Sequence, residues 1–436
     1  MNPNYQQQLE FLYSLQYSGI KLGLKNITRL LNELGNPQKH FPAVHLAGTN
    51  GKGSTAAFMA SVLQEAGYRV GLYTSPHLVD FTERIRINGE AIPREVLIEY
   101  VRELRAAIER IRPTFFEATT ALALRYFADR RVDVAVVETG LGGRLDATNL
   151  VEPVISVITP IGLEHQQYLG ETLEAIAGEK AGIIKPGIPV VTSTANSRVM
   201  DVFRNRAREL DAPLHVLEVE QAIRIHRYGL EGTRFALHTE RADFPALTIR
   251  LAGKHQVHNA ALAVEGLLRA AGLTVPSRAV EQGLARCFWP GRLHVLHRQP
   301  LVLLDVSHNP PGFRTTLSFL RELFPRASFK IILGLAKDKD SRSIVDILIG
   351  EAKEIALVEW FSERGLPARV LAQAFARHNV STTLFPDVAT AYRTMREHLT
   401  SREVLLIIGS HYLAGAFLEQ FPEYLYPTRT MGAGIH

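Results

Sequence analysis

Along most of the chain, short apolar runs alternate with segments whose apolar residues recur every three or four positions. Apolar runs typical of buried strands occur at 43–48, 70–75, 132–140, 153–161 and 188–193. Between them, residues 53–67 and 94–111 have the spacing of amphipathic helices, and Gly67 stands where a helix-ending glycine would. This alternation predicts a mostly parallel sheet covered by helices on both faces.

The pattern changes between Leu214 and Leu251, where apolar and polar residues nearly alternate, as in "RYGLEGTRFALHT" (227–239). Alternation of this kind predicts antiparallel strands joined by tight turns. We interpret them as a small sheet attached to the same domain. A helical segment, 251–272, follows.

A second alternating series begins after "ARCFWPGR", in which aromatic, Pro and Gly residues interrupt the periodicity. We place a domain boundary there, near residues 286–291. Strands are predicted at 301–312, 329–340, 354–360 and 403–415, with helices between them. The fold class expected is therefore α/β: a parallel-sheet domain with a small antiparallel sheet (1–290), followed by a smaller Rossmann-like α/β domain (291–436).

Composition narrows the class of protein. The chain has 436 residues, of which 46% are hydrophobic and 21% charged, so it can bury real cores and disorder is not expected. No stretch reaches the roughly 18 apolar residues that cross a bilayer, no leader pattern begins the chain, and Cys287 is the single cysteine. The net charge of +5 comes from 49 basic and 44 acidic residues without a basic block. We expect a cytoplasmic protein that binds small anions and neither nucleic acid nor membrane.

The segment "HLAGTNGKGST" (45–55) has the character of a phosphate-binding loop between a strand and a helix. It departs from the common pattern twice, because Leu46 stands where a glycine is usual and Gly53 follows Lys52. Its glycines let the backbone approach a polyphosphate, and Lys52 can reach the β- or γ-phosphate. This predicts a P-loop ATPase domain, although a glycine-rich turn without a ligand is the alternative.

Other polar residues follow predicted strands. Glu138 ends one strand, where nucleotide-binding folds often present an acid that holds Mg²⁺, although it could simply be solvated. The next residues, "GLGGRLD", place three glycines beside Arg144 and Asp146. His165 follows a strand expected to run parallel to that of Glu138, so both side chains could reach one crevice, as metal ligands or as structural residues.

Two further segments are less specific. Lys180 and Lys185 could each be ordinary surface lysines, and Asp305 and His308 at a strand end indicate by themselves only a polar loop.

Together the motifs resemble those of folylpolyglutamate synthase and the bacterial bifunctional dihydrofolate synthase, members of the Mur ligase superfamily. The similarity runs in the family's order from about Leu22 to Leu413. It is carried by "HLAGTNGKGST", "VVETGLGGRLDATN", "GLEHQQYLGETLEAIAGEKAGIIK", "WPGRL" and "DVSHNP". In that family a glycine follows the loop lysine, so the mismatch at Gly53 becomes a family feature.

The resemblance implies an ATP-dependent ligase that phosphorylates a folate carboxylate and lets the amino group of L-glutamate attack the acyl phosphate. Dihydropteroate, a reduced folate, or both remain open as the acceptor. Cofactors implied are ATP and Mg²⁺ at two sites, with a carbamylated Lys180 supporting the second. Family members are commonly monomers.

Residue roles implied by the resemblance fall into four groups. ATP would be bound by Thr49, Asn50, Gly51, Lys52, Gly53, Ser54, Asn259, Arg292 and Asp305. Mg²⁺ would be held by Ser75, Glu138 and His165. The acceptor would meet Arg84, Phe116, Glu117, Arg144 and Asp146. Lys52, Lys180 and His308 would serve catalysis, His308 near the transferring phosphate or the glutamate.

The chain departs from the family where "DVSHNP" replaces the commoner "DGAHNP" and "GLEH" replaces "GLDH". The first departure leaves Asp305 and His308 in place but puts the packing of their loop in doubt. Two other functions stay open: a cell-wall Mur ligase, which usually carries a further domain before the loop, and a non-enzymatic ATP-dependent switch.

Overall fold

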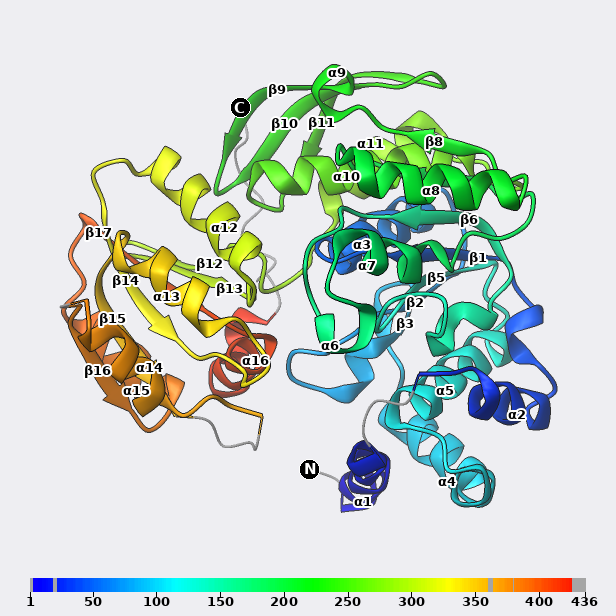
Figure 1. Ribbon diagram of the computed structural model, residues 1–436, viewed down its shortest axis with the longest axis horizontal. Helices are drawn as coiled ribbons and strands as arrows, with labels where there is room; N and C mark the ends of the chain where they lie inside the picture. Colours follow the sequence, from blue (N-terminus) through cyan, green and yellow to red (C-terminus); the bar gives the residue numbers. More distant parts are fainter. Residues whose placement is uncertain (1–2, 19–21, 360–363, 379, 426–436) are drawn as a thin grey trace. The chain divides into compact units, whose positions relative to one another are not determined.

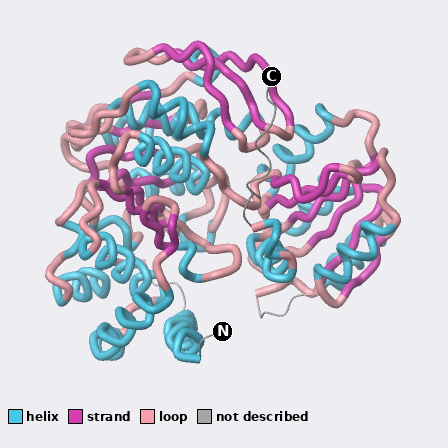
Figure 2. Tube along the Cα trace, turned by 180° about the vertical axis from the view of Figure 1, so that it is seen from behind, coloured by secondary structure: helices cyan, strands magenta, loops and turns pink. Residues whose placement is uncertain are grey.

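The computed structural model of this chain describes residues 3–18, 22–359, 364–378 and 380–425. It divides the chain into two compact units. The first consists of Met1–Arg227, Arg234–Arg250 and Gln256–Cys287, and the second of Tyr228–Thr233, Leu251–His255 and Phe288–His436. In each unit, helices lie on both sides of a sheet, as Figures 1 and 2 show. Within the described residues, no helix is both long and apolar enough to cross a membrane.

An eight-stranded sheet forms the centre of the first unit. Its strands are β1 (Ala43–Ala47), β2 (Val70–Tyr73), β3 (Ile85–Ile87), β4 (Glu90–Ala91), β5 (Val134–Glu138), β6 (Pro153–Ile158), β7 (Val190–Thr192) and β8 (Leu214–Val216). Their order is β4-β3-β2-β5-β1-β6-β7-β8. From β2 to β8 neighbouring strands run parallel, while β3 and β4 add an antiparallel edge. The expected fold class is confirmed for this unit.

Helices cover both faces of this sheet because alternate strand residues are apolar on both sides. The helices up to the end of this unit are α1 (Pro3–Ser14), α2 (Lys25–Glu33), α3 (Lys52–Glu65), α4 (Arg94–Ile111), α5 (Phe115–Asp129), α6 (Gln166–Leu169), α7 (Leu173–Ala181), α8 (Ser197–Glu209), α9 (Val219–Ala222), α10 (Lys254–Arg269) and α11 (Ser277–Arg286), of which α9 leads into the small sheet. On the face of Ala43 and Ala47, buried residues of α1, α2, α4 and α5 form one core, and those of α7 and α8 another. Val157 lies on the opposite face, against Gly266 of α10 and Met59 of α3.

The small sheet contains β9 (Ile223–Gly229), β10 (Gly232–His238) and β11 (Asp243–Ile249), in the order β11-β10-β9. Phe235, Leu237 and Phe244 are buried while their sequence neighbours are more exposed, which is the alternation that predicted it. The prediction was wrong at its first residues, 214–216, because β8 pairs parallel with β7 at the edge of the large sheet. A three-residue edge strand that is half covered also alternates, so the pattern cannot give its direction.

The second unit has a six-stranded sheet in the order β12-β13-β17-β14-β15-β16. The strands are β12 (His294–Arg298), β13 (Leu301–Asp305), β14 (Ser328–Leu333), β15 (Ala352–Val358), β16 (Thr382–Phe385) and β17 (Glu403–Ile408). Within the described residues, β12 runs antiparallel to β13, whereas the other neighbouring strands of this sheet run parallel. The helices are α12 (Pro310–Leu323), α13 (Ser341–Ile349), α14 (Ala368–Ala376), α15 (Val388–Glu397) and α16 (His411–Gln420). Trp360, the end of one predicted strand, lies outside the described residues.

Candidate active site

Four parallel strands of the first unit end at the same edge of the sheet. β1 lies between β5 and β6, and β2 lies on the far side of β5. The predicted phosphate loop follows β1, Glu138 ends β5, Ser75 follows β2 and His165 follows β6. Ligands of open α/β sheets bind beyond the carboxyl ends of such strands. The strand order therefore gathers these residues at one edge, although they are far apart in the sequence.

The phosphate loop approaches its neighbours more closely than any residue with a Cβ would allow. Gly48 has a φ of 146°, and a Cβ built on it would lie 1.8 Å from Oγ1 of Thr159. Gly51 caps α3 with a φ of 88°, and its Cβ would lie 2.4 Å from Oδ1 of Asn259. Asn259 in turn donates from Nδ2 to Oε1 of Gln256, 3.0 Å away. Asn259 is thus held beside the loop.

Hydrogen bonds from two threonines fasten this loop to the segment after β6. Thr49 Oγ1 donates to the Gly162 carbonyl at 3.1 Å and accepts from the Gly162 amide at 3.0 Å. Thr159 Oγ1 donates to the Asn50 carbonyl at 2.7 Å. The Lys52 ammonium donates to the carbonyls of Gly48 and Thr49, at 3.1 and 3.2 Å. Backbone amides at the start of a helix such as α3 can hold an anion.

Of the predicted metal ligands, Glu138 and Ser75 are adjacent. Glu138 is buried, and its Oε2 accepts a hydrogen bond from the Ser75 amide at 3.1 Å. His165 is one third exposed, and its Nε2 lies 3.9 Å from Oε1 of Glu164. The described residues contain no group of three or more His, Cys, Asp and Glu placed to hold a metal. The expected ligand set includes a serine, and the carboxylate of Glu138 and the hydroxyl of Ser75 are oxygen donors of the kind that Mg²⁺ prefers.

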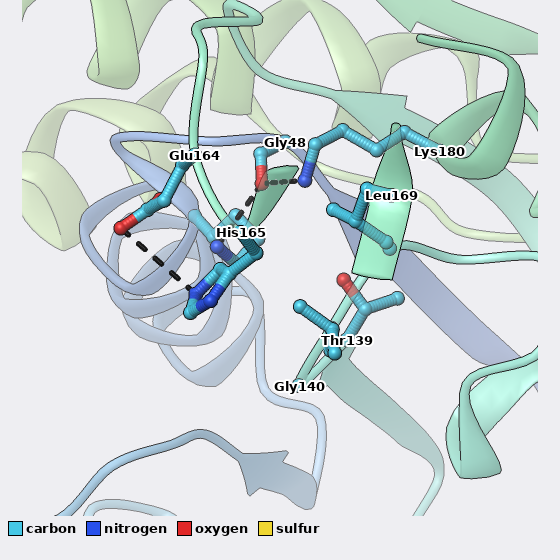
Figure 3. Close-up of a pocket in the computed structure, with 10 residues that line it drawn as sticks. Gly48, Thr139, Gly140, Glu164, His165, Leu169 and Lys180 are labelled. Atoms are coloured by element: carbon cyan, nitrogen blue, oxygen red, sulfur yellow. Dashed lines mark hydrogen bonds and ion pairs between the residues drawn. The ribbon is translucent and has the colours of Figure 1, made fainter. Parts of the chain in front are cut away.

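Lys180 points into a small pocket beside the phosphate loop (Figure 3). Its Nζ donates to the Gly48 carbonyl at 2.6 Å, and the side chain is 5% exposed. Burial, reinforced by the charge of Lys52, lowers the pKa of Lys180 to about 7. The pocket is lined by Gly48, Lys52, Thr139, Gly140, Leu141, Gly142, Glu164, His165, Leu169 and Lys180. A neutral Lys180 amine is therefore accessible near pH 7.

The loop after β5 is organised around Asp146. Its Oδ1 accepts from the Thr148 amide and hydroxyl at 3.0 and 2.6 Å, and its Oδ2 from the Gly140 and Leu141 amides at 3.0 and 2.8 Å. Burial raises the pKa of Asp146, and these hydrogen bonds oppose that rise. Arg144, by contrast, is exposed and pairs with Oε1 of Glu179 at 2.7 Å. Asp146 therefore shapes the loop, whereas Arg144 ties it to α7.

Three residues predicted to contact the acceptor, Arg84, Phe116 and Glu117, lie in or beside α5. Glu117 accepts from the Thr114 amide at 2.7 Å, completing a capping box, and from the Ile27 amide at 3.2 Å. The neighbouring Phe116 packs on Gly140, where a built Cβ would be 2.5 Å from the ring. Arg84 donates from Nε to Nδ1 of His77 at 2.8 Å.

His77 has a pKa of about 3, because it is buried and lies beside the charge of Arg84. Gly140 supports the Phe116 ring, and His77 accepts a hydrogen bond from Arg84. Neither contact could be predicted from the sequence.

In the second unit, Asp305 ends β13 and also organises a loop. It accepts from the Leu293 amide at 2.8 Å and the Ser307 amide at 2.9 Å. His308 donates from Nδ1 to the Val306 carbonyl at 3.0 Å, and its ring lies 5.3 Å from that of His411. Arg292 Nη2 is 3.4 Å from His411 Nε2. These contacts bring His308 and Arg292 to one cluster through His411.

Sequence reasoning missed His411 and Thr139. His411 follows β17, which pairs with β13 so that Ile408 lies beside Asp305. A histidine just after a strand was the available signal. Thr139 follows Glu138 directly and lines the Lys180 pocket, and its buried hydroxyl has no hydrogen-bond partner among the described residues. A polar residue next to a strand-end acid was the signal for it.

Comparisons with known proteins give concordant results. Residues 46–266 match the Mur ligase middle domain, and residues 291–411 match the glutamate ligase domain of Mur ligases. The chain is 37% identical to a dihydrofolate synthase/folylpolyglutamate synthase of Bacillus subtilis, over 94% of this chain and 97% of the relative. It is also 37% identical to a folylpolyglutamate synthase of Lacticaseibacillus casei, over 81% and 85%.

Two solved structures extend the comparison to the fold. Mycobacterium tuberculosis folylpolyglutamate synthase complexed with ADP and AMPPCP has a TM-score of 0.88 and 31% identity, covering 96% of this chain and 99% of that one. Escherichia coli FolC in complex with DHPP and ADP has a TM-score of 0.86 and 30% identity, covering 96% and 98%.

Proposed function

This chain belongs to the folylpolyglutamate synthase and dihydrofolate synthase family of Mur ligases, and on that premise we propose that it joins L-glutamate to dihydropteroate, a reduced folate, or both, using ATP. The observation that carries the proposal is the gathering of the phosphate loop, Glu138 with Ser75, and buried Lys180 at one sheet edge. The cited relatives are folate ligases, which argues against a cell-wall ligase and against an ATP-dependent switch.

The reaction needs an activated carboxylate, because a carboxylate resists attack by an amine at neutral pH. The acceptor carboxylate attacks the γ-phosphate of ATP, ADP leaves, and the acyl phosphate then reacts with the glutamate amine to give an amide and inorganic phosphate. The chain itself supplies position and charge. We propose that the α3 amides and Lys52 hold the phosphates, with Thr49, Asn50, Gly51, Gly53, Ser54 and Asn259 shaping the loop around them.

Mg²⁺, when bound, would offset charge on the transferring phosphate. We propose Glu138, Ser75 and His165 as its ligands, because Glu138 is a buried carboxylate beside Ser75 at the same edge. Arg292, Asp305 and His308 of the second unit remain proposed nucleotide or glutamate contacts. We assign residues 1–290 to ATP binding and 291–436 to the glutamate ligase domain, and propose that the enzyme works as a cytoplasmic monomer.

On the acceptor side, Phe116, Arg84, Arg144 and Asp146 remain proposed substrate contacts. Glu117 is better assigned as the residue that positions Phe116, since both of its carboxylate oxygens accept backbone amides. Asp146 also fixes the shape of its own loop by accepting the Gly140 and Leu141 amides.

The central test is ADP release. We expect Mg²⁺-dependent release that requires both L-glutamate and a pteroate or folate, with tetrahydrofolate and dihydropteroate compared as acceptors. Lys52→Ala should lose turnover and retain the far-ultraviolet circular dichroism of the wild type, since its ammonium donates to the backbone carbonyls of Gly48 and Thr49. ATP turnover that needs neither co-substrate would refute the ligase, and an active Lys52→Ala enzyme would remove the loop from catalysis.

A second test concerns carbamylation of Lys180, which would turn its amine into a carboxylate able to support a second metal ion. A neutral amine is required for attack on CO₂, and burial supplies one near pH 7. Lys180→Ala should lose activity and regain part of it with added short carboxylic acids. Lys185→Ala serves as the control, because Lys185 donates to the Asn149 carbonyl and is not among the pocket residues. Equal effects of the acid on both variants would contradict the carbamate.

A further inference from the structure

One buried histidine of the phosphate-loop strand makes a contact that the proposed reaction does not use. His45 lies in β1 between Ala43 and Ala47, and its side chain is fully buried. Its Nε2 lies 2.9 Å from Oγ1 of Thr148, a residue 103 positions further along the chain. The contact links the strand that begins the nucleotide loop to the loop that follows β5.

The direction of the hydrogen bonds follows from the groups themselves. Thr148 Oγ1 carries one proton, and its distance of 2.6 Å to Asp146 Oδ1 shows where that proton goes. Thr148 must then accept from His45, which fixes the proton of the imidazole on Nε2. Nδ1 of His45 is buried without a hydrogen-bond partner among the described residues, as expected for the unprotonated nitrogen. Burial, with the charge of Lys185, lowers the pKa of His45 to about 3, so the ring is neutral.

Asp146 carries the chain of contacts into the pocket. Its other oxygen accepts the amides of Gly140 and Leu141, which line the pocket beside Lys180. Gly140 is also the residue on which the Phe116 ring packs. A shift of Asp146 would therefore move the backbone that supports Phe116, whereas the hydrogen bonds that fasten Thr49 and Asn50 would remain.

We propose that His45 and Thr148 are positioning residues for the acceptor substrate: through Asp146 they fix the backbone at 140–141 and the Phe116 ring. The proposal rests on the proposed ligase function, because that function identifies the acceptor substrate as a pteroate or folate. It assigns to His45, within the phosphate-loop motif, a larger effect on pteroate or folate binding than on ATP binding, because the hydrogen bonds that fasten Thr49 and Asn50 do not involve Asp146.

The first test compares Thr148→Val with Thr148→Ser. Serine keeps the hydroxyl and should leave acceptor binding near that of the wild type. Valine keeps the shape of the side chain and removes the hydrogen bonds of the hydroxyl to His45 and Asp146. We expect Thr148→Val to weaken acceptor binding by roughly tenfold, because the displaced backbone at 140–141 and the Phe116 ring would have to be reordered when the acceptor binds. The dissociation constant for ATP should change less than about twofold. Isothermal titration calorimetry without glutamate measures both constants independently of turnover. Parallel losses for ATP and acceptor, or equal behaviour of valine and serine, would overturn the proposal.

The second test separates positioning from stability. Thr148→Val leaves the His45 N–H buried without an acceptor, whereas His45→Leu combined with Thr148→Val removes both polar partners, which costs less stability. The double variant should recover melting temperature relative to Thr148→Val and still bind the acceptor weakly. Recovery of acceptor binding together with melting temperature would show a merely structural role.

The third measurement tests the direction of the hydrogen bonds that connect His45, Thr148 and Asp146. Nitrogen-15 NMR of the His45 ring should show the proton on Nε2 in wild type and in Thr148→Ser, and a proton on Nδ1 would contradict the assigned direction. Failure of the ligase proposal is recognised separately, because a wild type that neither binds pteroates and folates nor turns over with them refutes that function, while the ring proton still tests these hydrogen bonds.

Discussion

At the scale of single residues, burial decides what the charged side chains can do. Lys180 and Lys52 both donate to the Gly48 carbonyl, yet the pKa of Lys180 is lowered to about 7 because it is buried. Asp146 and Glu138 are also buried acids, and each accepts backbone amides. Buried charges at a sheet edge are costly unless they are paired or hydrogen-bonded, so they indicate a site built for a ligand.

The pKa of Lys180 predicts a pH-dependent stability. Its folded pKa near 7 lies below the ordinary value of 10.5, so folding releases a proton between these two values. In CO₂-free buffer the wild type should gain stability as pH rises through this window, by at most about 1.4 kcal/mol per pH unit. Lys180→Met should lack this gain and be the more stable protein near pH 7. Urea denaturation across the window measures the difference, and a difference that is constant with pH would show that the folded lysine stays charged.

At the scale of elements, local sequence patterns predicted the helices, whereas the arrangement of the strands in the sheet depends on long-range packing. The spacing of apolar residues predicted a helix over 94–111, and α4 spans those residues. The edge strands β4, β8 and β16 are two to four residues long and partly exposed, so they carry too little periodicity to be assigned. Direction was equally hidden for β12, which is antiparallel because a short hairpin joins it to β13. Strand direction depends on connections that an apolar run does not encode.

The cap of α5 gives a prediction at this scale. Thr114→Ala should lower the free energy of unfolding by about 1 kcal/mol, the usual effect of losing an N-cap. Glu117→Ala should lower it by about 1–3 kcal/mol, because the Thr114 and Ile27 amides would be left without their acceptor. Glu117→Gln keeps an acceptor oxygen and should lose less. Chemical denaturation measures stability, and titration with the acceptor substrate shows whether Glu117 acts only through the helix. Weak acceptor binding by a stable Glu117→Gln protein would instead make Glu117 a direct contact.

At the scale of the whole molecule, the chain passes between its two units more often than the periodicity suggested. The sequence predicted one crossing, near residues 286–291, whereas Tyr228–Thr233 and Leu251–His255 also belong to the second unit. These segments lie at the tip of the small sheet and before α10, where Tyr228, Leu230 and Ala252 join the core of the second unit. Apolar residues at a turn indicate that the turn is buried, but the sequence does not indicate which of the two hydrophobic cores they pack against.

The candidate site shows the same division between local and long-range information. The strand-end positions of Glu138 and Asp305 could be predicted from single motifs, whereas His165, expected just after a strand, caps the short helix α6. The supports could not, because Thr148 meets His45 across 103 residues and Glu117 meets Ile27 across 90. Motifs identify the residues that face a ligand, while the groups that hold them belong to the tertiary packing.

The two threonine contacts of the phosphate loop have a kinetic consequence. Through hydrogen bonds with Gly162 and Thr159, loop residues 49 and 50 are joined to the segment after β6, so these contacts hold the loop without any nucleotide. A loop that is already rigid loses little conformational entropy on binding, and association then needs no slow rearrangement at this point. Nucleotide capture by the first unit should therefore be limited by diffusion and orientation, and any slow conformational step of the catalytic cycle must arise elsewhere in the chain.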